Sequence, residues 1–222
     1  MKNNKRQFAV LGLGIFGSTV SKTLSKYNCE VIAIDRNMEC VQRMADTVSV
    51  AIQGDITDIN ELKNAGVGDC DVAIVSTGSH LEESILCVLN LKELGIPYIV
   101  AKAKNKSYKQ ILEKVGADKV VRPEKEMGVE TAKGLLNKNI IDMVDIDDEY
   151  SIVEVAVPKS WIGKTLVELD VRRRFHVNIL GIRHSDNHLK VNPSTTYRFQ
   201  PNDHLLIISG SDRFTELDFL EK

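Results

Sequence analysis

The stretch QFAVLGLGIFG, residues 7–17, decides the fold of this chain. It opens with an apolar run of the kind that forms a buried parallel strand. It then places Gly12, Gly14 and Gly17 in the spacing G-x-G-x-x-G, and a second apolar run follows at Val31–Ile34. A strand, a glycine turn, a helix and a second strand in this order predict a Rossmann-type unit.

Each glycine has a separate physical role in such a unit. Gly12 permits the tight turn, Gly14 lets a pyrophosphate approach the backbone, and Gly17 lets the helix pack closely on the strand. The helix expected at 18–27 presents free N–H groups and a partial positive charge to the phosphates. Asp35 lies 18 residues after Gly17, where a carboxylate can accept hydrogen bonds from ribose hydroxyls. The stretch therefore predicts a nucleotide or dinucleotide site.

Asp35 and Arg36 leave the choice of nucleotide open. A carboxylate at the end of the second strand favours a free 2′-hydroxyl, so it favours NAD, ATP or ADP over NADP. An arginine beside it can accommodate a 2′-phosphate, although a solvated surface charge is the simpler interpretation of Arg36. A glycine-rich turn without a ligand is the alternative to a nucleotide site.

The composition is that of an ordinary globular protein. The 222 residues are 43% hydrophobic and 27% charged, and this length fits one large or two small domains. The formal net charge of −2 argues against a nucleic-acid partner, because nucleic-acid binders usually carry a basic face. The cysteines are scattered without a C-x-x-C pair, which is typical of reduced thiols in a cytoplasmic protein; they are Cys29, Cys40, Cys70 and Cys87.

Strands and helices keep alternating as far as residue 121, which predicts a doubly wound parallel sheet of the α/β class. Strands are expected at 48–53, 71–75, 98–101 and 118–121, and helices at 38–45, 59–65, 81–94 and 107–115. Loops at the carboxyl ends of such strands lie over the nucleotide crevice. The candidate binding residues in these loops are Gly54, Asp55, Ser76, Thr77, Gly78 and Lys102. A turn residue is the alternative for Asp55.

The helix expected at 81–94 has a broad apolar stripe. Leu81, Ile85, Val88 and Leu89 share one of its faces. A stripe of this width is typical of a helix buried on two sides, by its own sheet and by a second subunit. A helix that is well buried within one domain explains the pattern equally well.

The acidic stretch Asp142–Tyr150 is the best boundary between two domains. Before it, Pro123 suits the first turn of a helix. After it, the pattern changes to that of a small α+β domain, with helices expected at 165–175 and 212–220. We therefore predict a Rossmann domain over residues 1–140 that includes a helix at 124–137, a linker over 141–150 and an α+β domain over 151–222.

Five stretches together resemble the regulatory subunits of bacterial potassium-uptake channels of the Ktr/Trk type, and most closely the Ktr type. They are QFAVLGLG (7–14), LKELGIP (91–97), LEKVGAD (112–118), PEKEMGV (123–129) and DDEYSIVE (147–154). The resemblance covers essentially the whole chain. It implies an RCK-N Rossmann domain followed by an RCK-C domain, with 124–137 as the crossover helix.

The resemblance also implies a function without catalysis. Such proteins form homodimers that assemble into an octameric cytoplasmic ring beneath a membrane channel subunit, and nucleotides in the crevice switch the shape of the ring. In the Ktr type, ATP favours opening and ADP closing. By position, Gly12, Ile15, Phe16 and Gly17 would lie in the phosphate loop, Asp35 at the ribose, Lys102 near the phosphates, and Glu124 near a γ-phosphate, where it can hold Mg²⁺ or Ca²⁺ at the dimer interface.

Ile15 departs from the family pattern, because Ktr-type proteins commonly have an arginine that reaches a partner subunit's γ-phosphate there. A charge-assisted hydrogen bond is worth roughly 1.5–3 kcal/mol. Its absence would weaken the preference for ATP over ADP and shift the expected ligand toward ADP, NAD or NADH. The metal role of Glu124 depends on the same phosphate.

The RCK-C domain of some Ktr-type proteins binds cyclic di-AMP at the dimer interface. By position, Arg172 would meet a phosphate, Asn178 a base edge and Ile179 the base face, with Pro193 near the same pocket. An arginine suits phosphate geometry. The alternative is that Arg172 belongs to a solvated basic run and that Ile179 is a core residue.

Two other functions remain open. A small NAD-dependent oxidoreductase would need an acid/base pair, and Tyr98 and Lys102 have the Y-x-x-x-K spacing of one. That pair requires a helix, where residues i and i+4 share a face, whereas 98–101 is expected to be a strand. A nucleotide-binding module acting on a soluble partner is the third possibility.

Overall fold

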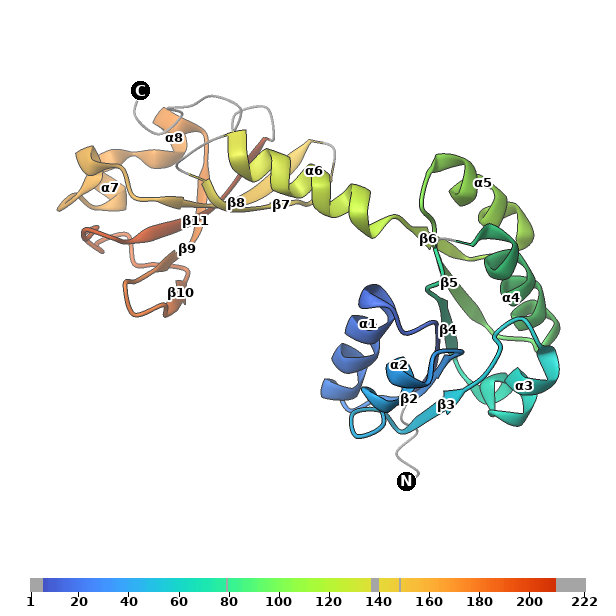
Figure 1. Cartoon of the computed structure of the whole chain (residues 1–222). Helices are drawn as coiled ribbons and strands as arrows, with labels where there is room; N and C mark the ends of the chain where they lie inside the picture. The colour runs from blue at the N-terminus through green and yellow to red at the C-terminus, as the bar shows by residue number, and fades with distance from the viewer. Residues whose placement is uncertain (1–5, 79, 137–139, 148, 211–222) are drawn as a thin grey trace. The chain divides into compact units, whose positions relative to one another are not determined.

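The computed structural model describes residues 6–78, 80–136, 140–147 and 149–210 (Figure 1). The chain divides into two compact units, Met1–Lys125 and Glu126–Lys222, and the division falls inside helix α6 (Pro123–Leu136). The helix expected at 212–220 lies outside the described residues, as does Asn137 at the end of the expected crossover helix.

The first unit contains a six-stranded parallel sheet with the strand order β3-β2-β1-β4-β5-β6. Its strands are β1 (Gln7–Leu11), β2 (Glu30–Asp35), β3 (Val50–Gln53), β4 (Val72–Val75), β5 (Tyr98–Lys102) and β6 (Lys119–Val121). Its helices before α6 are α1 (Ile15–Lys26), α2 (Met38–Gln42), α3 (Ile59–Asn64), α4 (Leu81–Glu93) and α5 (Lys106–Val115). The predicted doubly wound parallel sheet is confirmed.

Both faces of this sheet are buried, which explains the continuous apolar runs of its strands. In β1, Ala9 and Leu11 pack into the cluster shared with α3, α4 and α5. Phe8 and Val10 point to the other face and pack into the cluster shared with α1 and α2. The helices accordingly form two layers around the sheet (Figure 1).

The buried face of α4 agrees in part with the predicted one, because Val88 is buried and Leu81 and Ile85 pack against the same cluster. Ser84, Cys87, Val88 and Leu91 are buried, in the i, i+3, i+4, i+7 spacing of a helix that packs on one surface. Leu89, expected on that face, is 48% exposed. The sequence pattern missed Ser84, a small polar residue that is buried with its hydroxyl donating to the Thr77 carbonyl.

The second unit contains a five-stranded antiparallel sheet with the strand order β10-β9-β11-β8-β7. Its elements are β7 (Ile140–Asp145), β8 (Tyr150–Ala156), α7 (Leu166–Leu169), α8 (Val171–Phe175), β9 (Asn178–Arg183), β10 (Leu189–Val191) and β11 (His204–Gly210). The centre of its core is Trp161, whose ring lies 5.0 Å from that of Phe175 and 5.8 Å from that of Phe199. The predicted α+β class of this part is confirmed.

Two local predictions in the second unit are wrong. Much of the linker expected at 141–150 is strand β7, which pairs with β8, for example Met143 with Val153. Its acidic residues fit an edge strand, because exposed charges there discourage pairing with further strands. The single helix expected at 165–175 is two short helices, because Asp170 adopts a left-handed conformation (φ 45°, ψ 49°) that ends α7.

Glu154 is a nearly buried charge in the second sheet, with a side chain 11% exposed. It accepts hydrogen bonds from Nε and Nη2 of Arg183 at 2.8 and 3.0 Å, and Nδ1 of His204 lies 3.1 Å away. The hydrogen bonds from Arg183 are the main reason that the pKa of Glu154 lies below its ordinary value of 4.5. The ionised Glu154 therefore stabilises the folded unit above pH 4.5. This stabilisation is lost as the pH falls through the lower pKa that Glu154 has in the folded state.

Glu154→Gln is expected to lower the free energy of unfolding of the second unit by about 1–3 kcal/mol at pH 7. The difference in the free energy of unfolding between the variant and the native chain should become smaller below pH 4.5. Urea unfolding followed by the fluorescence of Trp161, the single tryptophan, measures this unit separately. The exposed Glu149 supplies the control Glu149→Gln, and a loss that is independent of pH would contradict the assignment.

Candidate functional site

The candidate site lies at the carboxyl ends of β1 and β4, where the strand order reverses. This is the switch point at which doubly wound sheets bind ligands. The loop after β1 is tied to its neighbours by backbone hydrogen bonds of 2.8 Å, from Gly12 N–H to the Ile34 carbonyl and from Ser76 N–H to the Leu11 carbonyl. The Ser76 hydroxyl also donates to the Gly12 carbonyl at 2.6 Å. The two loops that border the crevice are therefore held together.

The three glycines of the first loop have different surroundings. Gly12 has φ of +94°, a conformation that favours glycine. A Cβ on Gly17 would overlap the Gly12 carbonyl oxygen and lie 2.5 Å from the Ser76 hydroxyl oxygen. Gly14 has no atom within 4 Å of an added Cβ and precedes α1 as its N-cap without a side-chain bond. The space beside Gly14 therefore leads to the N-terminus of α1, where an anion is stabilised.

Two adjoining cavities open at this edge of the sheet. The larger has a volume of about 630 Å³ and is lined by Gly12, Gly14, Asp35, Ser76, Thr77, Gly78, His80, Glu83, Lys102, Lys104 and Glu124. The smaller, of about 190 Å³, is lined by Gly12, Asp35, Arg36, Gly54, Ile56, Thr77, His80 and Glu83. They share five residues, so one extended ligand can occupy both.

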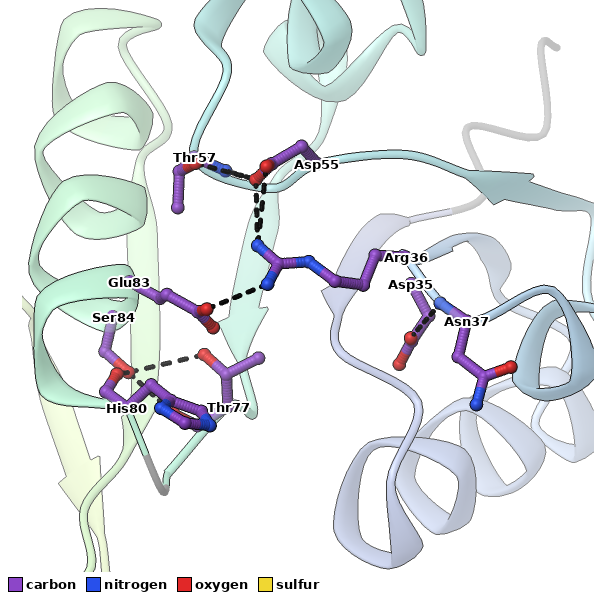
Figure 2. Close-up of polar contacts among 9 residues, drawn as sticks. All are labelled: Asp35, Arg36, Asn37, Asp55, Thr57, Thr77, His80, Glu83 and Ser84. Atoms are coloured by element: carbon purple, nitrogen blue, oxygen red, sulfur yellow. Dashed lines mark hydrogen bonds and ion pairs between the residues drawn. The ribbon is translucent and has the colours of Figure 1, made fainter.

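Asp35 joins the end of β2 to the glycine loop. Its Oδ2 accepts a hydrogen bond of 2.6 Å from Leu13 N–H. Its Oδ1 accepts one of 2.8 Å from Asn37 N–H, which Figure 2 shows. These bonds fix the direction of the carboxylate at the wall of both cavities. Each oxygen keeps a lone pair for a further donor, such as a ribose hydroxyl.

Lys102 and Glu124 form an ion pair at the other end of the larger cavity, with 2.6 Å between Nζ and Oε1. The Lys102 side chain is only 18% exposed, and its Nζ lies 5.9 Å from the centre of the Phe16 ring. Gly78 leaves room for it, since an added Cβ would lie 3.1 Å from Lys102 Cδ. The hydrogen bond from Lys102 is the main reason that the pKa of Glu124 is lowered.

The structure brings most of the sequence-derived candidates together. Ten of them line the cavities: Gly12, Gly14, Asp35, Arg36, Gly54, Ser76, Thr77, Gly78, Lys102 and Glu124. Four do not: Gly17 packs beneath the loop, Phe16 lies near Lys102, Asp55 contacts Arg36, and Ile15 is 91% exposed.

Sequence reasoning missed four lining residues, Ile56, His80, Glu83 and Lys104. His80 and Glu83 flank the start of α4, which follows β4. Lys104 lies two residues after Lys102. Ile56 and Lys104 lie close after the ends of β3 and β5, and that position was the signal available for them, whereas Glu83 lies inside α4 and had no such signal.

A separate cavity of about 780 Å³ lies in the second unit. Arg172, Asn178 and Ile179 line it, and Arg172 Nε donates a hydrogen bond of 2.8 Å to Asn178 Oδ1. Pro193 is not part of the lining, whereas the nearby Asn192 and Thr195 are. Three of the four residues expected there therefore face one cavity.

In the part of the chain that the structure describes, no group of three or more His, Cys, Asp or Glu side chains is arranged to hold a metal ion. None of the helices found there has both the length and the apolar character required to cross a membrane. Within the described residues, Glu124 is therefore not part of a group of three such side chains that could hold a metal ion.

Comparison with known families identifies both halves of the chain. Residues 8–123 match the TrkA-N domain, and residues 151–218 match the TrkA-C domain. The chain is therefore a protein with a Rossmann-like TrkA-N domain followed by a small TrkA-C domain. The chain belongs to the TrkA-N/TrkA-C family, within which it is homologous to the Ktr potassium-uptake proteins. The resemblance predicted from the sequence is confirmed.

Two relatives from Bacillus subtilis (strain 168) cover most of the chain. Ktr system potassium uptake protein C is 37% identical over 218 residues, which are 98% of this chain and 97% of that protein. Ktr system potassium uptake protein A is 40% identical over 179 residues, or 81% of each chain. The likeness to these proteins therefore extends over both units.

Solved structures share the fold at lower identity. The GsuK RCK domain has a TM-score of 0.66 at 18% identity, over 99% of this chain and 48% of that one. The GsuK channel bound to NAD has a TM-score of 0.64 at 18% identity, over 100% of this chain and 40% of that one. At this identity the likeness supports the fold assignment alone.

Proposed function

We propose that this chain is a non-enzymatic, ligand-sensing regulatory subunit of a bacterial potassium-uptake channel. It lies in the cytoplasm at the inner face of the membrane and binds ATP, ADP, NAD or NADH in the crevice of its first unit. The relatives of similar length are named potassium uptake proteins, which supports the biological role. The crevice geometry supports the ligand class.

The observation that carries this proposal is the charge distribution along the two cavities. Asp35 and Glu83 line both cavities, whereas Lys102 and Lys104 line only the larger one. A nucleotide matches this arrangement, with its ribose hydroxyls at Asp35 and its phosphates between the lysines and the N-terminus of α1. The same orientation puts the base in the smaller cavity.

Gating follows if the nucleotide binds two shapes of an assembled ring with different affinities. A ligand shifts a conformational equilibrium only by its differential affinity for the two states. We propose homodimers that assemble into an octameric ring beneath the membrane channel subunit. Mg²⁺ or Ca²⁺ at Glu124 would need further ligands, from a nucleotide phosphate or a second subunit.

Calorimetric titration of the whole chain with ATP, ADP, NAD and NADH tests the ligand class. Lys102→Met keeps the aliphatic stem of the side chain and removes its charge, so we expect roughly ten- to hundredfold weaker binding, which corresponds to about 1.5–3 kcal/mol. The control Lys63→Met removes an exposed charge from the end of α3 and should change nothing.

Two results would overturn the proposal. Unchanged affinity in Lys102→Met would place the phosphates elsewhere, and the absence of any nucleotide binding would remove the sensor. Transfer of hydride from NADH to a substrate would favour the alternative of a small oxidoreductase. Co-purification with a soluble protein instead of a membrane channel subunit would favour an independent binding module.

The second unit favours one further ligand, cyclic di-AMP. The cavity of about 780 Å³ places the Arg172 guanidinium and the Asn178 amide beside the apolar Ile179, which suits phosphate, base edge and base face in turn. Cyclic di-AMP belongs in the same set of titrations. Its binding should be independent of Lys102→Met, because that residue lies in the other unit.

A further inference from the structure

Arg36 connects two loops and the first turn of helix α4 at the smaller cavity. Its Nη1 lies 3.0 Å from Glu83 Oε1, and its Nη2 lies 3.4 Å from Asp55 Oδ2 (Figure 2). Arg36 follows β2, Asp55 follows β3, and Glu83 lies in the first turn of α4. The two carboxylates, Glu83 first, raise the pKa of Arg36 above its ordinary value. Both ends of the guanidinium are therefore engaged before any ligand arrives.

Asp55 and Glu83 are themselves held in place. Asp55 Oδ1 accepts hydrogen bonds from Thr57 N–H at 2.9 Å and from the Thr57 hydroxyl at 2.6 Å, and these bonds are the main reason that the pKa of Asp55 is lowered. The start of α4, which carries Glu83, is anchored by the buried Ser84, whose hydroxyl donates to the Thr77 carbonyl at 2.8 Å. The guanidinium therefore lies between one carboxylate that Thr57 holds and one that is carried by an anchored helix start.

We propose that Glu83 is a specificity-determining residue of the nucleotide site. It holds the Arg36 guanidinium against Asp55 and so withdraws the cation that would otherwise accept a 2′-phosphate. The site then takes adenine nucleotides with a free 2′-hydroxyl and rejects 2′-phosphorylated ones. This inference rests on the nucleotide binding proposed above.

The charges around the ribose position support the same conclusion. Asp35, Asp55 and Glu83 supply three carboxylates, against the single guanidinium of Arg36. A 2′-phosphate would bring a further negative charge into this acidic group without gaining a free cation. A ribose hydroxyl, in contrast, donates to Asp35 and brings no charge.

Specificity is a more suitable role for this ion pair than stabilisation of the fold. The Arg36 side chain is 59% exposed, and exposed ion pairs contribute little to folding. Removal of the Glu83 charge should therefore leave a folded chain whose nucleotide preference can be measured.

The test measures binding of NAD and NADP to the native chain and to Glu83→Gln by calorimetry. We expect the native chain to bind NADP at least a hundredfold more weakly than NAD. In Glu83→Gln, which releases one side of the guanidinium, the NADP-to-NAD affinity ratio should rise at least tenfold. Addition of Arg36→Met should abolish that rise, because Arg36 is the group that accepts the phosphate.

The matched control is Glu82→Gln, which removes the same charge from the neighbouring, exposed position of α4. An equal rise in this control would show that only the net charge of the helix start matters, and it would overturn the role of Glu83. Equal affinity of the native chain for NAD and NADP would also overturn it while leaving the nucleotide site intact. Failure of the native chain to bind any of ATP, ADP, NAD and NADH would overturn the proposed function itself.

Discussion

Gly17→Ala is expected to destabilise the first unit by about 3 kcal/mol or more, and to abolish nucleotide binding as a result. The added Cβ would overlap the Gly12 carbonyl oxygen and lie 2.5 Å from the Ser76 hydroxyl oxygen. Neither neighbour can retreat easily, because hydrogen bonds tie Gly12 to Ile34 and Ser76 to Leu11. Denaturant unfolding followed by far-ultraviolet circular dichroism measures this unit, which contains most of the described helices.

Gly14→Ala is the matched variant, three residues away in the same loop. No atom lies within 4 Å of its added Cβ and its φ is −62°, so the free energy of unfolding should stay nearly unchanged. Nucleotide affinity should nevertheless fall at least tenfold, because the methyl group occupies the approach of the pyrophosphate. Equal destabilisation by both substitutions would contradict the packing role of Gly17. Normal nucleotide binding by Gly14→Ala would contradict the phosphate position.

Ile15→Arg is expected to increase the preference for ATP over ADP by roughly ten- to a hundredfold. The gain corresponds to one charge-assisted hydrogen bond of about 1.5–3 kcal/mol, made to the γ-phosphate of a nucleotide held by a second subunit. Ile15 is 91% exposed at the start of α1, so the longer side chain displaces no buried contact. Titration of native and variant chains with ATP and ADP, in the presence of Mg²⁺, gives the two ratios.

The control for this experiment is Thr19→Arg, which adds the same charge to an exposed position one turn along α1. It should leave the ratio of ATP to ADP affinity unchanged. An unchanged ratio in Ile15→Arg would show that this position does not reach a γ-phosphate. A strong preference for ATP in the native chain would show that another residue already supplies the contact.

Much of the first unit was predictable because its signals are local. The apolar runs of β1, β2 and β4 mark strands buried on both faces, and the glycine spacing marks the turn between β1 and α1. The end of α3 and the start of β6 also agree with the sequence pattern to within about one residue. Such features depend on a few neighbouring residues.

The second unit was less predictable because its features depend on distant partners. The charges of 141–150 suggested a linker, but β7 forms by pairing with β8, which local composition does not show. The helix expected at 165–175 ends early at Asp170, whose left-handed conformation has no strong sequence signal for an aspartate. Strand pairing accounts for the first error, and the backbone conformation of Asp170 accounts for the second.

The same distinction applies to the candidate site. Asp35, Ser76 and Lys102 were predictable because the carboxyl ends of parallel strands meet at one edge of a sheet. Glu83 and its contact with Arg36 were not, because that contact requires the strand order of β2, β1 and β4 and the start of α4 to be known together.

Under the nucleotide binding proposed above, the ion pair between Lys102 and Glu124 would make Glu124 a competitor for the phosphate position. An incoming phosphate does not meet a free ammonium group; it must exchange with a carboxylate that already lies 2.6 Å away. The released carboxylate belongs to the first turn of α6, a helix whose remaining turns are part of the second unit. Under that proposal, occupancy of the crevice would release a carboxylate at the start of α6, which is the one described helix that both units share.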